Sequence, residues 1–123
     1  MDHTYEDQNI FAKILRGEIP NATVLETEHS LAFNDISPQA PAHVLVIPKG
    51  PYVCFDHFAA AASDAEIADF TRAVGEVCRL AGVAADGYRL IANAGRDGVQ
   101  DVPHLHVHVL GGRRLGRMLS PVS

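Results

Sequence analysis

The sequence predicts an α+β fold in which an antiparallel sheet of about five strands carries its helices on one face. Segments with strand character outnumber long helical patterns along the chain. A parallel sheet would need a crossover helix after nearly every strand, and only one long helical pattern is present. With 123 residues, of which 47% are hydrophobic and 20% charged, the chain is expected to form one compact domain with a buried core.

The first half of the chain contains one short helical pattern and three strand patterns. Apolar residues recur at helical spacing from Asn9 to Arg16, and Gly17 follows as a stop signal. Strands are expected at Thr23–Glu28, Ser30–Asn34 and His43–Ile47. Two prolines between the second and third of these exclude a central strand there, so that stretch is expected to be a turn.

The second half contains the long helix and two further strands. A long connection leads to Ser63, which forms a capping box with Glu66 and starts a helix that Gly82 ends. An apolar stripe follows one side of this helix. Strands are expected at Tyr88–Asn93 and His104–Leu110, separated by a Gly- and Asp-rich loop.

Composition and charge limit the kinds of binding partner and the cellular compartment that we expect for this protein. Ten Lys and Arg residues face 15 Asp and Glu, so the net charge is −5, which argues against a nucleic acid polymer as partner because such binding needs many cations. No apolar run approaches the ~18 residues of a membrane helix, and the N-terminus is acidic where a secretory signal would be basic. We therefore expect a cytoplasmic protein without membrane contact. Cys54 and Cys78 form no Cys-x-x-Cys motif and are expected to be reduced, packed thiols.

The last predicted strand carries a histidine at every second position. His104, His106 and His108 should share one face of the strand, and the intervening apolar residues should share the other. A buried apolar face fixes the register, so the three imidazoles are expected to line a surface or a pocket.

Two chemistries compete for this row of histidines. Imidazole is a common zinc ligand, but the outer Cα atoms of His104 and His108 would lie about 13 Å apart, so a metal site would need another ligand such as His43. Alternatively, one neutral imidazole attacks phosphorus while its neighbours supply donors to the phosphate oxygens. The Gly-rich loop before the row favours phosphate, because its backbone N–H groups can approach an oxyanion closely. Asp35, which follows a predicted strand, is compatible either with holding a ribose diol or with capping the turn after it.

These residues resemble a known family. The His104–Leu110 segment matches the His-x-His-x-His signature of the histidine triad superfamily of nucleotide hydrolases and transferases. The segments Phe33–His43, Val46–Lys49 and Gly111–Arg113 are similar to its histidine triad nucleotide-binding (Hint) branch, and the likeness runs from about Asn9 to Leu119.

The resemblance implies a five-stranded antiparallel sheet with two helices that dimerises into a ten-stranded sheet. It implies a single domain over residues 1–123, with a core at 9–112 and a C-terminal tail at 113–123. It also implies that His106 is the nucleophile, oriented by a backbone carbonyl, that His108 contacts the α-phosphate, and that His104 and His43 form a relay that tunes His106. The nucleotide-binding positions that it implies are Phe33, Asp35, Ile36, Asn93, Val99, Gln100 and Asp101.

Three departures from the family pattern concern substrate contacts. Val99 stands where several members have glycine, and a β-branched residue adopts positive φ only with strain, so the loop geometry is expected to differ. Asp101 stands where some members have a serine near the leaving group. The tail has no tryptophan, which leaves acceptor selectivity open.

The leading hypothesis is a purine nucleoside phosphoramidase or related nucleotidyl hydrolase that forms a covalent intermediate on His106, with an AMP- or GMP-type ligand and no metal or other cofactor. A dinucleoside polyphosphate hydrolase of the same superfamily is the alternative enzyme. A nucleotide-binding regulator with little turnover and a histidine-only metal-binding protein are the alternatives from other classes.

Overall fold

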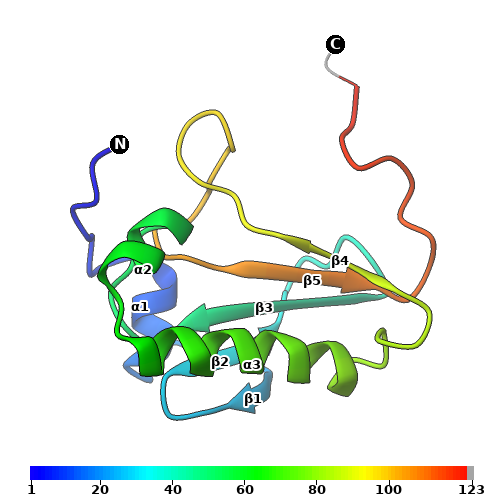
Figure 1. Ribbon diagram of the computed structural model, residues 1–123, viewed down its shortest axis with the longest axis horizontal. Helices are drawn as coiled ribbons and strands as arrows, with labels where there is room; N and C mark the ends of the chain where they lie inside the picture. The colour runs from blue at the N-terminus through cyan, green and yellow to red at the C-terminus, as the bar shows by residue number, and fades with distance from the viewer. Residues whose placement is uncertain (122–123) are drawn as a thin grey trace.

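The computed structural model, which describes residues 1–121, contains one five-stranded sheet in the order β1-β2-β3-β5-β4 (Figure 1). All neighbouring strands are antiparallel, so the predicted α+β class is confirmed. The strands are β1 (Thr23–Glu26), β2 (Ser30–Asn34), β3 (Ala42–Pro48), β4 (Tyr88–Ile91) and β5 (Val107–Gly111). The helices are α1 (Ile10–Leu15), α2 (Phe55–Ala61) and α3 (Asp64–Leu80). Val122 and Ser123, the end of the predicted tail, lie outside the described residues.

The helices cover both faces of the sheet, which corrects the expectation of one covered face. Helix α3 packs on the face that carries Val44, Val46 and Val109. Helix α1 packs Phe11 and Ile14 against the opposite face, over apolar residues of β2 and β3. The central strands β2 and β3 are almost entirely buried, without alternation between inside and outside. Strands that are buried on both faces need a covering element on each side. Their continuous apolar runs in the sequence therefore indicated that helices would cover both faces of the sheet.

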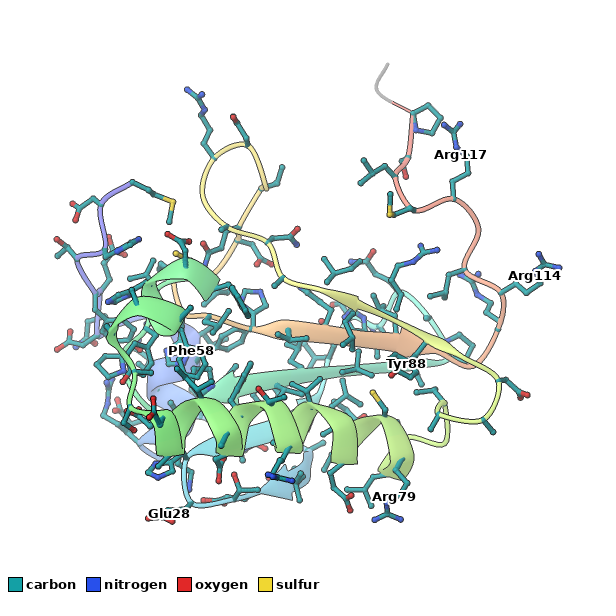
Figure 2. The ribbon with its side chains drawn as sticks, viewed as in Figure 1. Glu28, Phe58, Arg79, Tyr88, Arg114 and Arg117 are labelled. Atoms are coloured by element: carbon teal, nitrogen blue, oxygen red, sulfur yellow. The ribbon has the colours of Figure 1, made fainter. Side chains whose placement is uncertain are left out.

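The long helix α3 was predicted correctly, whereas α2 was not. Ser63 caps α3 by accepting from the N–H of Glu66, and the Glu66 side chain accepts from the N–H of Ser63. In α2, which was expected to be part of a long connection, only Phe58, labelled in Figure 2, is buried. It packs against Phe70 of α3 with ring centroids 5.1 Å apart. One buried position in seven leaves no helical stripe for the sequence to show.

Strand β5 starts three residues later than predicted. Its ladder with β3 begins where Val46 pairs with Val107, so His104 and His106 precede the strand. There the backbone N–H of Leu105 donates to the carbonyl of Tyr52 at 2.8 Å instead of to a strand neighbour. The alternation itself is confirmed, because Leu105, like Val107, joins the core under α3.

His104 is fully buried rather than part of a surface or pocket lining. Its Nε2 lies 2.8 Å from the carbonyl oxygen of Pro48, and its Nδ1 lies 2.6 Å from the hydroxyl of Tyr5. A carbonyl only accepts, so Nε2 carries the proton and the Tyr5 hydroxyl donates to Nδ1. Burial lowers the pKa of His104 to about 4, so the imidazole is neutral at physiological pH.

No helix among residues 1–121 has both the length and the apolar character to cross a membrane.

We expect the free energy of unfolding to fall by roughly 2 kcal/mol between pH 7 and pH 5 through His104 alone. The unfolded imidazole takes up a proton near pH 6.5, whereas the folded one does so only near pH 4. The unfolded state therefore binds more protons in this window, and the stabilisation that is complete above pH 6.5 is lost as the pH falls toward 4.

Urea unfolding at the two pH values measures this loss. In His104→Gln the free energy of unfolding should change much less between the two pH values. His29→Gln, which removes a partly exposed histidine, should keep most of the pH dependence of the unaltered protein. Equal pH dependence in His104→Gln and the unaltered protein would contradict the assignment.

Candidate active site

The orientation of the His106 ring is fixed by a hydrogen bond to the backbone. Its Nδ1 lies 2.7 Å from the carbonyl oxygen of His104, so Nδ1 carries the proton and Nε2 keeps its lone pair. The ring of Phe11, from α1, stands edge to face against it with centroids 4.9 Å apart. Only 2% of His106 is exposed, so its orientation is fixed by packing as well as by the hydrogen bond.

The register of β3 and β5 brings His43 and His108 together on the face of the sheet that α1 covers. A hydrogen bond of 2.9 Å joins His43 Nε2 to His108 Nδ1. The backbone N–H of Gln39 donates to His43 Nδ1 at 3.0 Å, so the proton of neutral His43 sits on Nε2 and is donated to His108. Because Nδ1 of neutral His108 accepts this proton, the proton of His108 itself sits on Nε2. That N–H takes no part in the hydrogen bond with His43.

Both members of this pair are neutral at physiological pH. Burial lowers the pKa of His108 to about 4, with further lowering by the neighbouring His106 and His43. Burial also lowers the pKa of His43, against the opposing attraction of Asp35. The directional chain from Gln39 through His43 to His108 is consistent with this neutrality, because a protonated ring could not accept at Nδ1.

Asp35 has a confirmed role in the turn. Its Oδ1 accepts from the backbone N–H of Ser37 at 2.8 Å, and its Oδ2 lies 3.4 Å from Nε2 of His43. Two other positions expected at the base site are not brought together: Phe33 is buried in the core beside Phe11, whereas Ile36 is 93% exposed.

The expected relay between His104 and His43 is absent. His104 bonds to Tyr5 and Pro48, and His43 bonds to Gln39 and His108. The reason is that His104 precedes the β3–β5 ladder, so it lies at the opposite end of the row from His43, whose ladder partner is Leu110.

The loop before the row uses two of its expected phosphate donors internally. Val99 has φ +56°, so it adopts the left-handed conformation that strains a β-branched residue, and its N–H donates to the carbonyl of Arg96. The side-chain amide of Gln100 donates to the carbonyls of Val53 and Val102 and accepts from the N–H of Gly95. These two positions therefore shape the loop through their own hydrogen bonds.

Two further residues of this region, Asp101 and Asn93, were also expected at the nucleotide. Asp101 is 77% exposed at its side chain, and its Oδ1 lies 3.3 Å from Nε2 of His106. Asn93 is half-buried, two positions after the end of β4. The Asp101 carboxylate thus lies directly beside Nε2 of His106, the ring nitrogen that does not face the His104 carbonyl.

Three groups at this site were missed by sequence reasoning. They are the Tyr5 hydroxyl on His104, the Phe11 ring on His106 and the backbone N–H of Gln39 on His43. Tyr5 and His104 are 99 positions apart, and no local pattern connects them. Phe11 could be predicted only as an apolar residue of the first helix.

The arrangement suits nucleophilic chemistry better than metal binding. Ligand atoms of Asp35, His43 and His108 lie within 4.8 Å of one another. However, the two imidazole nitrogens share a proton at 2.9 Å, and an ion between them would break the hydrogen-bond chain that runs from Gln39 through His43 to His108. What remains is an unprotonated imidazole nitrogen on His106 beside a donor on His108.

Comparisons with known proteins agree with this geometry. A family model described as HIT domain matches residues 16–115. An uncharacterized 13.2 kDa HIT-like protein of Azospirillum brasilense is 62% identical over 98% of both chains. The purine nucleoside phosphoramidase of Escherichia coli K12 is 42% identical over 93% of this chain and 95% of its own length. The solved structure of a histidine triad protein from Clostridium difficile superimposes with a TM-score of 0.79 at 37% identity, covering 93% of this chain and 98% of that one.

The matched residues, 16–115, include the histidine row and all five strands. The chain therefore belongs to the HIT domain family.

Proposed function

We propose that the protein is a purine nucleoside phosphoramidase that cleaves the P–N bond between a nucleoside monophosphate and an amine. The observation that carries the proposal is the carbonyl of His104, which takes the Nδ1 proton of His106 as a hydrogen bond and leaves Nε2 as a lone pair. The 42% identity to the E. coli phosphoramidase over nearly the whole chain supports the same reaction class.

The reaction proceeds in two displacements at phosphorus. Nε2 of His106 attacks phosphorus, the new N–P bond forms as the P–N bond of the substrate breaks, and the leaving nitrogen takes a proton from solvent and departs as the amine. Water then attacks phosphorus and gives up a proton to solvent, the bond to His106 breaks, and the nucleoside monophosphate and a free imidazole result. The Nε2–H of His108 donates to a phosphate oxygen during both steps, where negative charge builds up.

The protein's own side chains supply the contacts that this reaction needs, without a metal or other cofactor. The second oxygen of Asp35 holds the ribose hydroxyls, and the exposed side chain of Ile36 next to it contacts the base. Asn93 donates to the phosphate region. Asp101 swings outward as the phosphate enters, because like charges repel.

We further propose that the protein is a homodimer joined along β4. Strand β4 is an edge strand, and edges expose unpaired N–H and C=O groups. Its Tyr88 and Leu90 are 48% and 46% exposed, beside a hollow of about 390 Å³ that Phe70 and Val74 of α3 help to line. Edge-to-edge pairing would cover this apolar surface on both copies and close without forming fibres.

Replacement of His106 by Asn should abolish turnover of an adenosine phosphoramidate while changing the affinity for AMP by less than about tenfold, because the nucleophile acts mainly in the transition state. Turnover should persist in the unaltered protein after exhaustive chelation. A variant that keeps most of its kcat would show that His106 is not the nucleophile, and loss of turnover on chelation would show that a metal takes part.

Replacement of Asp35 by Asn should weaken ribonucleotides by roughly 1.5–3 kcal/mol and analogues without the ribose hydroxyls much less, because a charged acceptor is lost. Titration calorimetry with both sugars measures the difference. Asp97→Asn, which removes an exposed carboxylate from the loop, is the matched charge control. Equal losses for both sugars would restrict Asp35 to its contacts with Ser37 and His43.

Replacement of Leu90 by Lys should shift the mass measured by light scattering at micromolar concentration from about two chains to one, because a charge would have to be buried in the interface. Leu80→Lys is the matched control, since Leu80 is also 46% exposed but lies at the end of α3. A single-chain mass for the unaltered protein would contradict the dimer.

A further inference from the structure

Three side chains with metal-binding atoms converge away from the histidine row. They are His3, which precedes the first helix, Cys54, which stands just before the first residue of α2, and Asp56 in the first turn of α2. One ligand atom from each lies within 4.8 Å of the other two. Sequence reasoning assigned no metal ligands and described Cys54 as a packed thiol, because nothing local relates it to a histidine 51 positions away.

The separations of these atoms match those of ligands around one ion. Cys54 Sγ lies 3.6 Å from His3 Nε2, and His3 Nε2 lies 3.5 Å from Asp56 Oδ2. Around a tetrahedral zinc ion, with bonds of about 2.3 Å to sulfur and 2.0–2.1 Å to nitrogen or oxygen, the same pairs would be about 3.6 Å and 3.4 Å apart. The other carboxylate oxygen, Asp56 Oδ1, accepts the thiol proton of Cys54 at 3.0 Å, and this hydrogen bond is lost when the sulfur binds an ion.

Neighbouring groups hold the histidine in place. The ring of His3 stacks on that of His57 with centroids 4.5 Å apart and an angle of 14°. His57 is itself fixed, because its Nδ1 accepts from the backbone N–H of Val53. A supported ligand ring loses less freedom when it binds an ion, as the outer contacts of metal-binding histidines generally show.

The same atoms do not form a nucleophilic thiol site. In a cysteine–histidine–aspartate triad the two ring nitrogens serve different partners, but here Nε2 of His3 faces both Cys54 and Asp56. The thiol donates to Asp56 instead of to the imidazole, and burial raises the pKa of Cys54. A thiol held in its protonated form is a poor nucleophile.

We propose that His3, Cys54 and Asp56 form a binding site for a divalent transition metal ion of zinc type, distinct from the histidine row. Thiolate, imidazole and carboxylate together suit such an ion and leave a fourth position for water. Cys54 is fully buried, whereas the side chains of His3 and Asp56 are 34% and 73% exposed, so an ion enters from solvent and comes to rest on the sulfur. On binding, the S–H bond gives way to a metal–sulfur bond and the proton passes to solvent.

An ion at this site joins the start of the chain to α2. His3 lies two positions before Tyr5, whose hydroxyl donates to the buried His104. The ion would therefore fix the segment that completes the hydrogen bonding of His104, without touching the atoms that react.

The test uses the full-length protein, freed of metal with a chelator that is then removed. The protein is reduced with a phosphine, because a thiol reductant would itself bind Co²⁺, and it is titrated with Co²⁺ under anaerobic conditions. A thiolate bound to Co²⁺ gives a charge-transfer band in the near ultraviolet, and zinc should bleach this band by displacement. Cys54→Ser should abolish the band, whereas Cys78→Ser, which alters the other buried cysteine, should keep it. His3→Gln should weaken Co²⁺ at least roughly tenfold, and His29→Gln should not.

The proposal fails if the unaltered protein binds Co²⁺ without a charge-transfer band, which would place the ion on the histidine row, or if it binds none. It also fails if His3→Gln binds as tightly as the unaltered protein. His3 is at the surface, so this variant remains informative even if Cys54→Ser is destabilised. None of these readouts depends on turnover.

Discussion

Peptide groups determine which nitrogens of the buried imidazoles carry protons, and the rest of the site depends on this. The carbonyl of His104 fixes the proton of His106, the carbonyl of Pro48 fixes that of His104, and the N–H of Gln39 fixes that of His43. Peptide groups do not titrate, so these assignments need no nearby charge to maintain them. The scaffold therefore presents a lone pair on one ring and a donor on another in a protein whose net charge is negative.

Burial of histidines is commonly costly, and the structure avoids that cost by complete hydrogen bonding. Within residues 1–121 every buried side-chain nitrogen and oxygen has a partner. Neutral imidazoles then behave as polar members of the core: His104 fills space between the N-terminal segment and β3, and His106 packs against Phe11. Both rings are therefore held in place, because movement of either would break the hydrogen bond of a buried polar group.

The sequence predicted the parts that depend on neighbours along the chain. The two-residue period of the histidine row, the capping box of Ser63 and the antiparallel sheet of five strands follow from local patterns, and the structure contains them. The missing parts depend on distant contacts. Neither the Tyr5 hydroxyl on His104 nor the pairing of His43 with His108 rather than His104 can be read from spacing, because both follow from where the β3–β5 ladder begins.

The loop before the histidine row shows that the conformational preference of a single residue does not predict its backbone conformation. Its geometry was expected to change where valine replaces glycine, yet Val99 adopts the left-handed conformation that glycine favours. Contacts elsewhere in the loop, chiefly those of Gln100 with Val53 and Gly95, hold it there. The preference of valine against positive φ is outweighed by the hydrogen bonds of the Gln100 side chain with Val53, Gly95 and Val102.

The N-terminal segment has a consequence for how such domains are cut and recombined. The family match begins at residue 16, which leaves Tyr5 and Phe11 outside it. A chimera spliced at that boundary would inherit every histidine of the row together with a foreign environment around two of them. Transplanting the motif alone is thus insufficient, and the transferable unit has to include the preceding chain as far as the residue whose hydroxyl reaches His104.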